Sequence, residues 1–352
     1  MEQWPSLVDI AEAAASAGTR ISVVQVADRD EHLRRNGVDY HFVAVGNLGV
    51  TERARRMARL LGDIGTDVAH VHSLGAAESA HALARELPLL PILLQDHADR
   101  VPARWRRARW RRWYGAARGV AFTAPELARP YVTAGLLDPT TRLFVIPESI
   151  SRFTPGSRAQ AWADTGLYGD PCVVSVGHLQ TGKDPLTVLD GIALASESLP
   201  GLRFWCAFGS APLLARVQQR IAGDSRLRER VHLLGKVAHP RVQSLMRAAD
   251  VFVSGSHAES CGYALLEALA CGVTPVVTNI PSFRALAGDV GVLWQRGDAK
   301  ALAAALVRAA AQRPSPDVVR AHFDNTLSLR AVGLRWADAY AQLAQATRRD
   351  AT

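Results

Sequence analysis

Lysine, paired cysteines and long apolar runs are all scarce in this chain of 352 residues. Only Lys183, Lys236 and Lys300 are lysines among its 41 basic residues, although the net charge is +8. The four cysteines show no Cys-x-x-Cys spacing and lie in or beside apolar segments, which indicates neither a zinc site nor a disulfide framework. No apolar run approaches the roughly 20 residues that a membrane-spanning helix needs, and the first residues lack a signal-peptide pattern. We therefore expect a cytoplasmic protein with no metal ligands.

The composition that is present is that of a globular protein with two domains of ordinary size. Hydrophobic residues make up 48% of the chain and charged residues 21%, which excludes a disordered polypeptide. The excess of arginine suits phosphate, anionic lipid or nucleic acid, so charge alone does not choose a partner.

Short β-type runs alternate with helical stretches along the whole chain, which predicts parallel sheets covered by helices. A polar stretch with turn residues at positions 147–156 separates two halves. We predict an N-terminal domain over 1–150, a second domain over 151–326 and a final helical segment over 327–352. The predicted strands are 21–26, 40–45, 68–71, 91–95, 120–123, 143–146, 172–176, 203–207, 231–234, 250–254, 275–278 and 291–293.

The chain begins with a helix where a doubly wound domain should begin with a strand. Trp4 and Pro5 precede a run rich in alanine that Gly18 ends. We expect that a first strand is missing because the start codon was placed too far downstream. The alternative is a true loss of one edge of the domain.

One segment has the pattern of a ligand site. Residues 249–254 and 274–278 are apolar strand signals, and the sequence between them runs through Glu259 and Gly262 into a helix that carries Glu267. Helix N-termini in such βαβ units bind phosphates, because unpaired N–H groups and the helix dipole both favour negative charge. A lone carboxylate in an apolar helix would be costly to bury, and the hydroxyls of a ribose would satisfy Glu267. Taken alone, the two glutamates are a weak signal, and a surface or capping salt bridge would explain them.

The order of strand, Ser/Gly loop, glutamate, glycine, helix, second glutamate and Cys-Gly helix end resembles the nucleotide-sugar site of the GT-B glycosyltransferases, specifically glycosyltransferase family 4. The resemblance implies two Rossmann-like doubly wound domains facing a cleft, and a last helix that crosses back to the N-terminal domain. It also implies metal-independent transfer with retention at the anomeric carbon and no cofactor besides the nucleotide-sugar donor. Glu259 would hold the donor sugar and Glu267 the ribose. The N–H groups of Cys261, Gly262 and Tyr263 would lie against the diphosphate.

A second segment, from Val173 to Pro185, follows the form of the family's other donor loop. Gly177 and His178 end a strand, and Lys183 stands where the family places a lysine for the diphosphate. His178 replaces the family's arginine, and a neutral histidine carries less charge. A solvated loop lysine is the alternative interpretation of Lys183.

Histidines also end two strands of the N-terminal half. The resemblance places His97 at the reacting sugar, and we predict it as catalytic together with Lys183 and Glu259. His70 is interpreted as a strand-packing residue, whereas His72 is left open between a core and a site role. Glu148 stands where relatives often have Asn-Gly, and we assign it no catalytic role.

Residues 104–114 mix arginine with Trp105, Trp110, Trp113 and Tyr114. An amphipathic helix at an anionic membrane surface has this composition, although arginines interrupt the aromatic face. A helix that buries its tryptophans in the domain core is the alternative, and we expect no nucleic-acid partner.

The sequence thus predicts a glycosyltransferase that uses a nucleotide-sugar donor and a glycan or lipid-linked acceptor. Two alternatives stay open: a nucleotide-sugar binding protein without turnover, and a GT-B-fold sugar-nucleotide epimerase.

Overall fold

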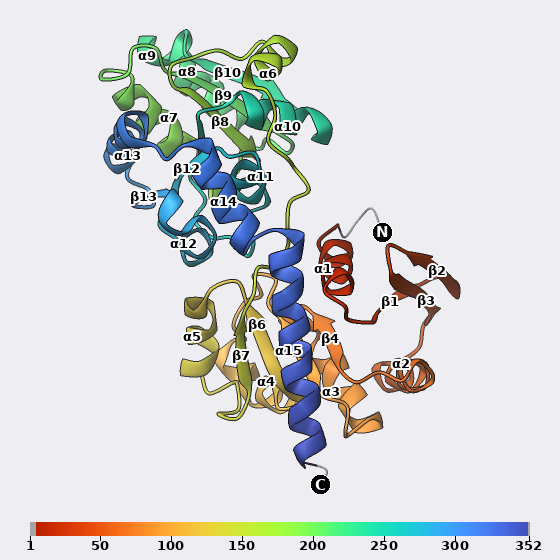
Figure 1. Ribbon diagram of the computed structural model, residues 1–352. Coiled ribbons are helices and arrows are strands. Elements are labelled where there is room, and N and C mark those ends of the chain that lie inside the picture. Colours follow the sequence, from red (N-terminus) through yellow and green to blue (C-terminus); the bar gives the residue numbers. More distant parts are fainter. Residues whose placement is uncertain (1–4, 351–352) are drawn as a thin grey trace. The chain divides into compact units, whose positions relative to one another are not determined.

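The computed structural model describes residues 5–350 as an α/β protein that divides into two compact units (Figure 1). The N-terminal unit comprises Met1–Ile150 together with Leu329–Thr352, and the C-terminal unit comprises Ser151–Ser328. Trp4, which we expected near the start of the first helix, lies outside the described residues. Within residues 5–350, no helix has the length and apolar character needed to cross a membrane.

The C-terminal unit is built on one parallel sheet with the strand order β10-β9-β8-β11-β12-β13. Its first strand, β8, lies in the middle and pairs with β9 on one side and β11 on the other. This is the doubly wound order, in which the direction of winding reverses between the two central strands. The strands are β8 (Cys172–Gly177), β9 (Arg203–Phe208), β10 (Val231–Gly235), β11 (Val251–Ser254), β12 (Thr274–Thr278) and β13 (Val292–Trp294).

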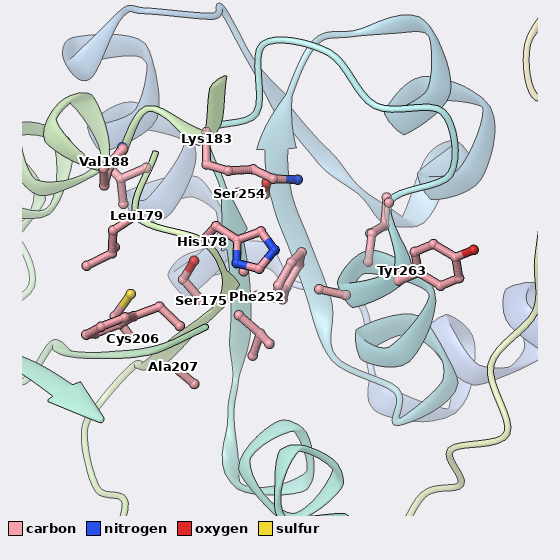
Figure 2. Close-up of a pocket in the computed structure, with 18 of the residues that line it drawn as sticks. Ser175, His178, Leu179, Lys183, Val188, Cys206, Ala207, Phe252, Ser254 and Tyr263 are labelled. Carbon is pink, nitrogen blue, oxygen red and sulfur yellow. The ribbon is translucent and has the colours of Figure 1, made fainter. Parts of the chain in front are cut away.

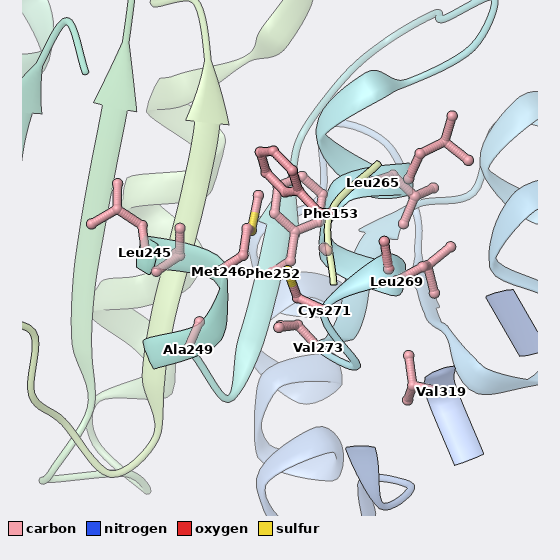
Figure 3. Packing of buried hydrophobic residues seen from close by; sticks show 14 of the residues in the cluster. Phe153, Leu245, Met246, Ala249, Phe252, Leu265, Leu269, Cys271, Val273 and Val319 are labelled. Carbon is pink, nitrogen blue, oxygen red and sulfur yellow. The ribbon is translucent and has the colours of Figure 1, made fainter. Parts of the chain in front are cut away.

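Helices cover both faces of this sheet, because successive side chains of a strand point to opposite faces. Val173 and Val251 belong to one buried cluster, whereas their neighbours Val174 and Phe252 belong to the other. Figure 3 shows the second cluster, where Phe252 meets side chains from the covering helices. The helical segments are α6 (Arg158–Thr165), η3 (Thr181–Lys183), α7 (Pro185–Ala195), α8 (Leu214–Ala222), α9 (Ser225–Arg228), α10 (His239–Ala248), α11 (Tyr263–Ala270), α12 (Pro281–Ala287), η4 (Gly288–Val290), α13 (Ala299–Gln312) and α14 (Pro316–Thr326).

The N-terminal unit contains two sheets that are not paired with each other. One is parallel with the order β4-β5-β6-β7, and the other has the order β1-β3-β2. The strands are β1 (Ile21–Ala27), β2 (Glu31–Arg35), β3 (Val38–Ala44), β4 (Ala69–His72), β5 (Ile92–Gln95), β6 (Ala117–Phe122) and β7 (Arg142–Val145). The helical segments are α1 (Pro5–Ser16), α2 (Val50–Ile64), η1 (Leu74–Ala76), α3 (Ala77–Glu86), η2 (Arg104–Arg106), α4 (Arg107–Tyr114), α5 (Pro125–Thr133) and α15 (Leu329–Asp350). The first strand that the resemblance implies before α1 stays a prediction.

The expectation of purely parallel pairing is wrong at one place. Strand β2 was not predicted, and it pairs antiparallel with β3. Asn36 and Gly37 connect the two strands, and both have positive φ angles, of 50° and 79°. An Asn-Gly pair with this geometry is the preferred two-residue turn of a β-hairpin. The signal was therefore present in the sequence, but the charged composition of β2 obscured it.

Helix α15 packs against α1 within the N-terminal unit. The contact is close because Gly333 has no side chain: a Cβ atom there would lie 2.1 Å from the carbonyl oxygen of Ala13. The apolar face of α15 adds the buried side chains of Val332, Trp336 and Leu343 to the core of this unit.

Candidate functional site

A cavity of about 340 Å³ opens at the carboxyl ends of β8 and β11 in the C-terminal unit. These two strands flank the point where the winding of the sheet reverses, which is where open α/β sheets bind ligands. Its volume falls in the range of small-molecule pockets. The side chains of His178, Lys183 and Tyr263 lie around it (Figure 2). The lining also includes Gly177, Glu259, Gly262 and Glu267, so the structure brings most of the predicted donor residues together.

The loop after β8 places Lys183 at this cavity. Lys183 ends the short helix η3, and Asp184, with a φ of 46°, begins α7 as its N-cap. Oδ2 of Asp184 lies 3.0 Å from Nε2 of His257. The N–H of His257 also donates to the carbonyl of Gly182, at 2.8 Å. The loops after β8 and β11 are thereby joined to each other.

Glu259, from the loop after β11, pairs directly with Lys183. Lys183 Nζ and the Ser256 hydroxyl both donate to Glu259 Oε1, the latter at 2.6 Å. Ser256 is fully buried, and its carbonyl accepts a hydrogen bond of 2.6 Å from the hydroxyl of Thr278. A serine whose own position is fixed therefore holds the carboxylate, and a cation and an anion face the same cavity.

Gly262 turns the chain into α11. Its φ of 75° is unfavourable for residues with a side chain, and an added Cβ would lie 2.6 Å from the ring of Phe283. No side chain caps the first turn of α11, whose N-terminus adjoins the cavity. Such a terminus attracts negative charge. Cys261 is buried and is not part of the cavity wall.

Glu267 does not lack a partner, contrary to the reasoning that made it a ribose ligand. Its Oε1 lies 2.6 Å from Nε2 of His239, at the start of α10. Burial raises the pKa of Glu267, and the hydrogen bond and charge of His239 oppose this effect. His239 itself is exposed and lies beside the ring of Phe153. The sequence contained no spacing that would link His239 to Glu267, which is 28 residues away.

His178 lines the cavity, and its Nδ1 accepts a hydrogen bond of 3.1 Å from the N–H of Ser210. Because Nδ1 of His178 is used by this hydrogen bond, its Nε2 is the nitrogen that can contact a ligand. The exposed ring can therefore reach a ligand through one nitrogen, whereas an arginine would offer several donors.

A second group of polar side chains lies in the N-terminal unit, around His97. His97 Nδ1 lies 2.6 Å from Glu148 Oε1, and His97 Nε2 lies 3.1 Å from His72 Nδ1. The sequence left the role of His72 undecided, and the structure places its side chain in this group. It also corrects the treatment of Glu148 as a residue of the linker alone, because its side chain is buried against His97. His70 packs instead against the rings of Trp336 and Tyr340.

Asp99 fixes the two loops that carry these histidines. Its carboxylate accepts hydrogen bonds from the N–H groups of Leu74, Gly75 and His97 and from the Ser73 hydroxyl, at 2.7 to 3.2 Å. Ser73 and Ala98, which follow His72 and His97, have positive φ angles of 75° and 59°. Such strain persists only where surrounding contacts enforce it, and it is common at functional sites.

Residues 104–114 form η2 and α4. Tyr114 is buried, and Trp110 and Trp113 pack against the core of the N-terminal unit. Trp105 is 78% exposed, and the guanidinium of Arg106 lies 4.3 Å from its ring centre. Most of the aromatic residues are therefore packing residues, and Trp105 alone among these four stands out from the surface.

Comparisons with known proteins agree with the position of the C-terminal cavity. Residues 170–312 match the family model described as "Glycosyl transferases group 1". The chain is 33% identical over 209 residues to the D-inositol 3-phosphate glycosyltransferase of Geodermatophilus obscurus, an alignment that covers 56% of this chain and 46% of that protein. It is 39% identical over 129 residues to the protein of the same name from Mycobacteroides abscessus, covering 36% of this chain and 28% of that protein. The chain therefore spans less than half the length of these curated relatives.

Solved structures show the same fold over nearly the whole chain. Sucrose-phosphate synthase from Thermosynechococcus elongatus has a TM-score of 0.72 at 20% identity, covering 98% of this chain and 94% of the other. An Anabaena protein solved in complex with UDP and glucose has a TM-score of 0.62 at 17% identity, with the same coverage. The predicted GT-B-type fold with two Rossmann-like domains is confirmed.

Proposed function

We propose that this chain, which carries a glycosyl transferases group 1 domain over residues 170–312, is a transferase that moves a sugar from a nucleoside diphosphate to an acceptor. The single observation that carries the proposal is the pairing of Lys183 with Glu259 beside the N-terminus of α11. A cation, an anion and a helix N-terminus then meet at the carboxyl ends of the two central strands.

The chemistry of the donor explains why these groups belong together. When the sugar leaves a nucleoside diphosphate, negative charge develops on the phosphate oxygens, and fixed positive groups stabilise that charge in the transition state. Lys183 and the first turn of α11 supply the positive groups, and Glu259 accepts hydrogen bonds from sugar hydroxyls. His178 can donate one further hydrogen bond to the diphosphate.

The proposal assigns Glu267 to the ribose. Binding of the ribose hydroxyls there requires His239 to move away from Glu267 Oε1 or to share it. His239 can do so because its side chain is exposed. In the N-terminal unit, His97 is the group proposed to contact the reacting sugar. Retention at the anomeric carbon and independence from metal ions belong to the same proposal and rest on the resemblance.

The test of this proposal is a transfer assay. Release of nucleoside diphosphate is measured from UDP-, GDP- and ADP-sugars with a panel of acceptors that includes D-inositol 3-phosphate, which appears in the name of the curated relatives. Glu259→Gln should lower kcat/KM by about tenfold or more, since hydrogen bonds to charged groups contribute about 1.5–3 kcal/mol. Glu229→Gln, at an exposed position of the same unit, should leave the rate unchanged. Equal rates for the two variants would refute the assigned site, and donor binding without transfer would favour a binding protein.

A membrane-apposed acceptor is the second part of the proposal, and the exposure of Trp105 supports it. A tryptophan flanked by arginines suits the boundary between lipid headgroups and acyl chains. Combining Trp105→Ala with Arg106→Gln should weaken sedimentation with anionic phospholipid vesicles. Leu89→Ala, which removes another exposed apolar side chain, should not. If the double variant sediments with the vesicles as well as the Leu89→Ala variant does, residues 104–114 have only a packing role.

A further inference from the structure

Glu148, His97 and His72 form a continuous chain of hydrogen bonds in the N-terminal unit. Glu148 lies two residues before the end of the first segment of this unit, His97 follows β5, and His72 ends β4. The distances are 2.6 Å from Glu148 Oε1 to His97 Nδ1 and 3.1 Å from His97 Nε2 to His72 Nδ1. Both nitrogens of His97 are therefore engaged by side chains from two other parts of the chain.

The carboxylate in this chain is costly to bury. Glu148 is only 5% exposed, and its Oε2 has no hydrogen-bond partner among the described residues. A buried charge is tolerated where a partner of opposite charge or a strong donor compensates it. His97 is the group that compensates Glu148 here, and Asp99 holds the backbone of His97 at 3.2 Å.

Titratable side chains face His97 from each of the neighbouring segments. Asp96 and Asp99 lie on its own loop, Glu148 on the segment after β7, and His70 and His72 on β4. Burial alone would lower the pKa of His97, but the hydrogen bond and charge of Glu148, together with the charges of Asp99 and Asp96, raise it above its ordinary value. Burial, followed by the charge of His97, lowers the pKa of His72 to about 3, so His72 is neutral near pH 7.

We propose that Glu148 is the positioning residue of His97: its carboxylate accepts a hydrogen bond from the Nδ1–H and thereby leaves Nε2 as the nitrogen that exchanges a proton or a hydrogen bond with a substrate. His72 occupies Nε2 in this structure and is the group that a substrate would replace there. This inference rests on the proposed transfer reaction only where it concerns the role of Glu148 and His97 in turnover. The tautomer and the charge of His97 are properties of the protein without substrate.

Two protonation states follow from this assignment. Below its pKa, His97 is an imidazolium that donates to Glu148 and to His72. Above its pKa, His97 loses the Nε2 proton and keeps the Nδ1–H, which still donates to Glu148. Neutral His72 then changes from its Nε2–H to its Nδ1–H tautomer and donates to His97 Nε2. The Glu148 contact is common to both states, so only Nε2 titrates.

The test is an NMR titration of the full chain labelled with ¹⁵N-histidine. His97 is assigned by the resonance that His97→Gln removes. In the parent protein, the neutral form of His97 should be the Nδ1–H tautomer, which is the less common one for free histidine. If neutral His97 is instead the Nε2–H tautomer, the proposal is overturned by this measurement on the parent protein alone, and no substitution of Glu148 is needed.

Glu148→Gln adds a second, independent measurement. The amide can still accept the Nδ1 proton but lacks the charge, so the pKa of His97 should fall by about one to three pH units. Glu31→Gln, which removes an exposed carboxylate from β2, should leave it unchanged. An unchanged His97 pKa in folded Glu148→Gln would also overturn the proposal.

Activity separates this inference from the proposed function. If the parent protein transfers sugar, the limb of the kcat profile that titrates with His97 should move to lower pH in Glu148→Gln, with the donor KM within about twofold. If no transfer is found with any donor, the proposed function fails, and the tautomer measurement still decides the role of Glu148.

Discussion

Asp96 is a buried carboxyl group that lies beside two other acidic side chains. Burial raises its pKa to about 6, the charges of Asp99 and Glu148 add to this effect, and backbone hydrogen bonds from Asp99 and Ala98 oppose it. The native state therefore binds the proton more tightly than the unfolded state does. The stability that Asp96 contributes is fully present below its ordinary pKa of 3.8 and is lost as the pH rises to about 6.

Asp96→Asn should remove this dependence, because an amide keeps the hydrogen bond from the Asp99 N–H and carries no charge. Relative to the parent, the variant should gain about 3 kcal/mol of unfolding free energy between pH 3.5 and pH 7. Urea unfolding across this range measures the gain. Asp63→Asn, at an exposed position of α2, is the control. A difference between parent and Asp96→Asn that does not change with pH would show that the pKa of Asp96 is not raised in the native state.

Residue identities alone could identify the candidates but not their partners. Lys183 and Glu259 were predicted separately, and the structure joins them through one hydrogen bond. The contacts of His239 and Glu148 were not predicted, although Glu148 was considered and assigned no catalytic role, because each partner lies far away in the sequence. Their recognition needs the distances between side chains, which a single sequence does not contain.

At the scale of elements, periodicity predicted the strands within about three residues of their ends. It failed at β2, where the charged residues of an edge strand hid the hairpin that Asn36 and Gly37 indicate. Packing between helices could not be predicted either, because the sequence does not show which glycine faces another helix.

Two glycines in helices should respond to alanine in opposite ways. Gly333→Ala places a Cβ 2.1 Å from the carbonyl oxygen of Ala13 and should destabilise the contact between α15 and α1 by about 1–3 kcal/mol. Gly62→Ala, in α2, meets nothing within 4 Å and should stabilise the protein by about 0.5–1 kcal/mol. Unfolding free energies of both variants check this. A neutral Gly333→Ala would show that α15 does not approach α1 as closely as described.

Across the whole molecule, the alternation of strands and helices was sufficient to predict two α/β units, and the resemblance of residues 249–272 pointed to the C-terminal one as the donor unit. The doubly wound order is found in the C-terminal sheet, whereas the sheet β4-β5-β6-β7 of the N-terminal unit is wound in one direction. The structure adds that the loops carrying Lys183 and Glu259, which are proposed to bind the donor, follow the two central strands of one sheet, which is why they converge. The acceptor is not encoded in a comparable motif.

Lys183 is proposed to bind the diphosphate of the donor, and Lys300, one of only three lysines in the chain, offers a matched control. Isothermal titration with UDP, GDP and ADP identifies the nucleotide that the parent protein binds. Lys183→Ala should then weaken its affinity by about tenfold or more, since a charge-assisted hydrogen bond is lost, whereas Lys300→Ala, at an exposed position of α13, should keep the parent affinity. Equal affinity of Lys183→Ala and the parent, or no binding of any of the three nucleotides by the parent, would contradict the claim.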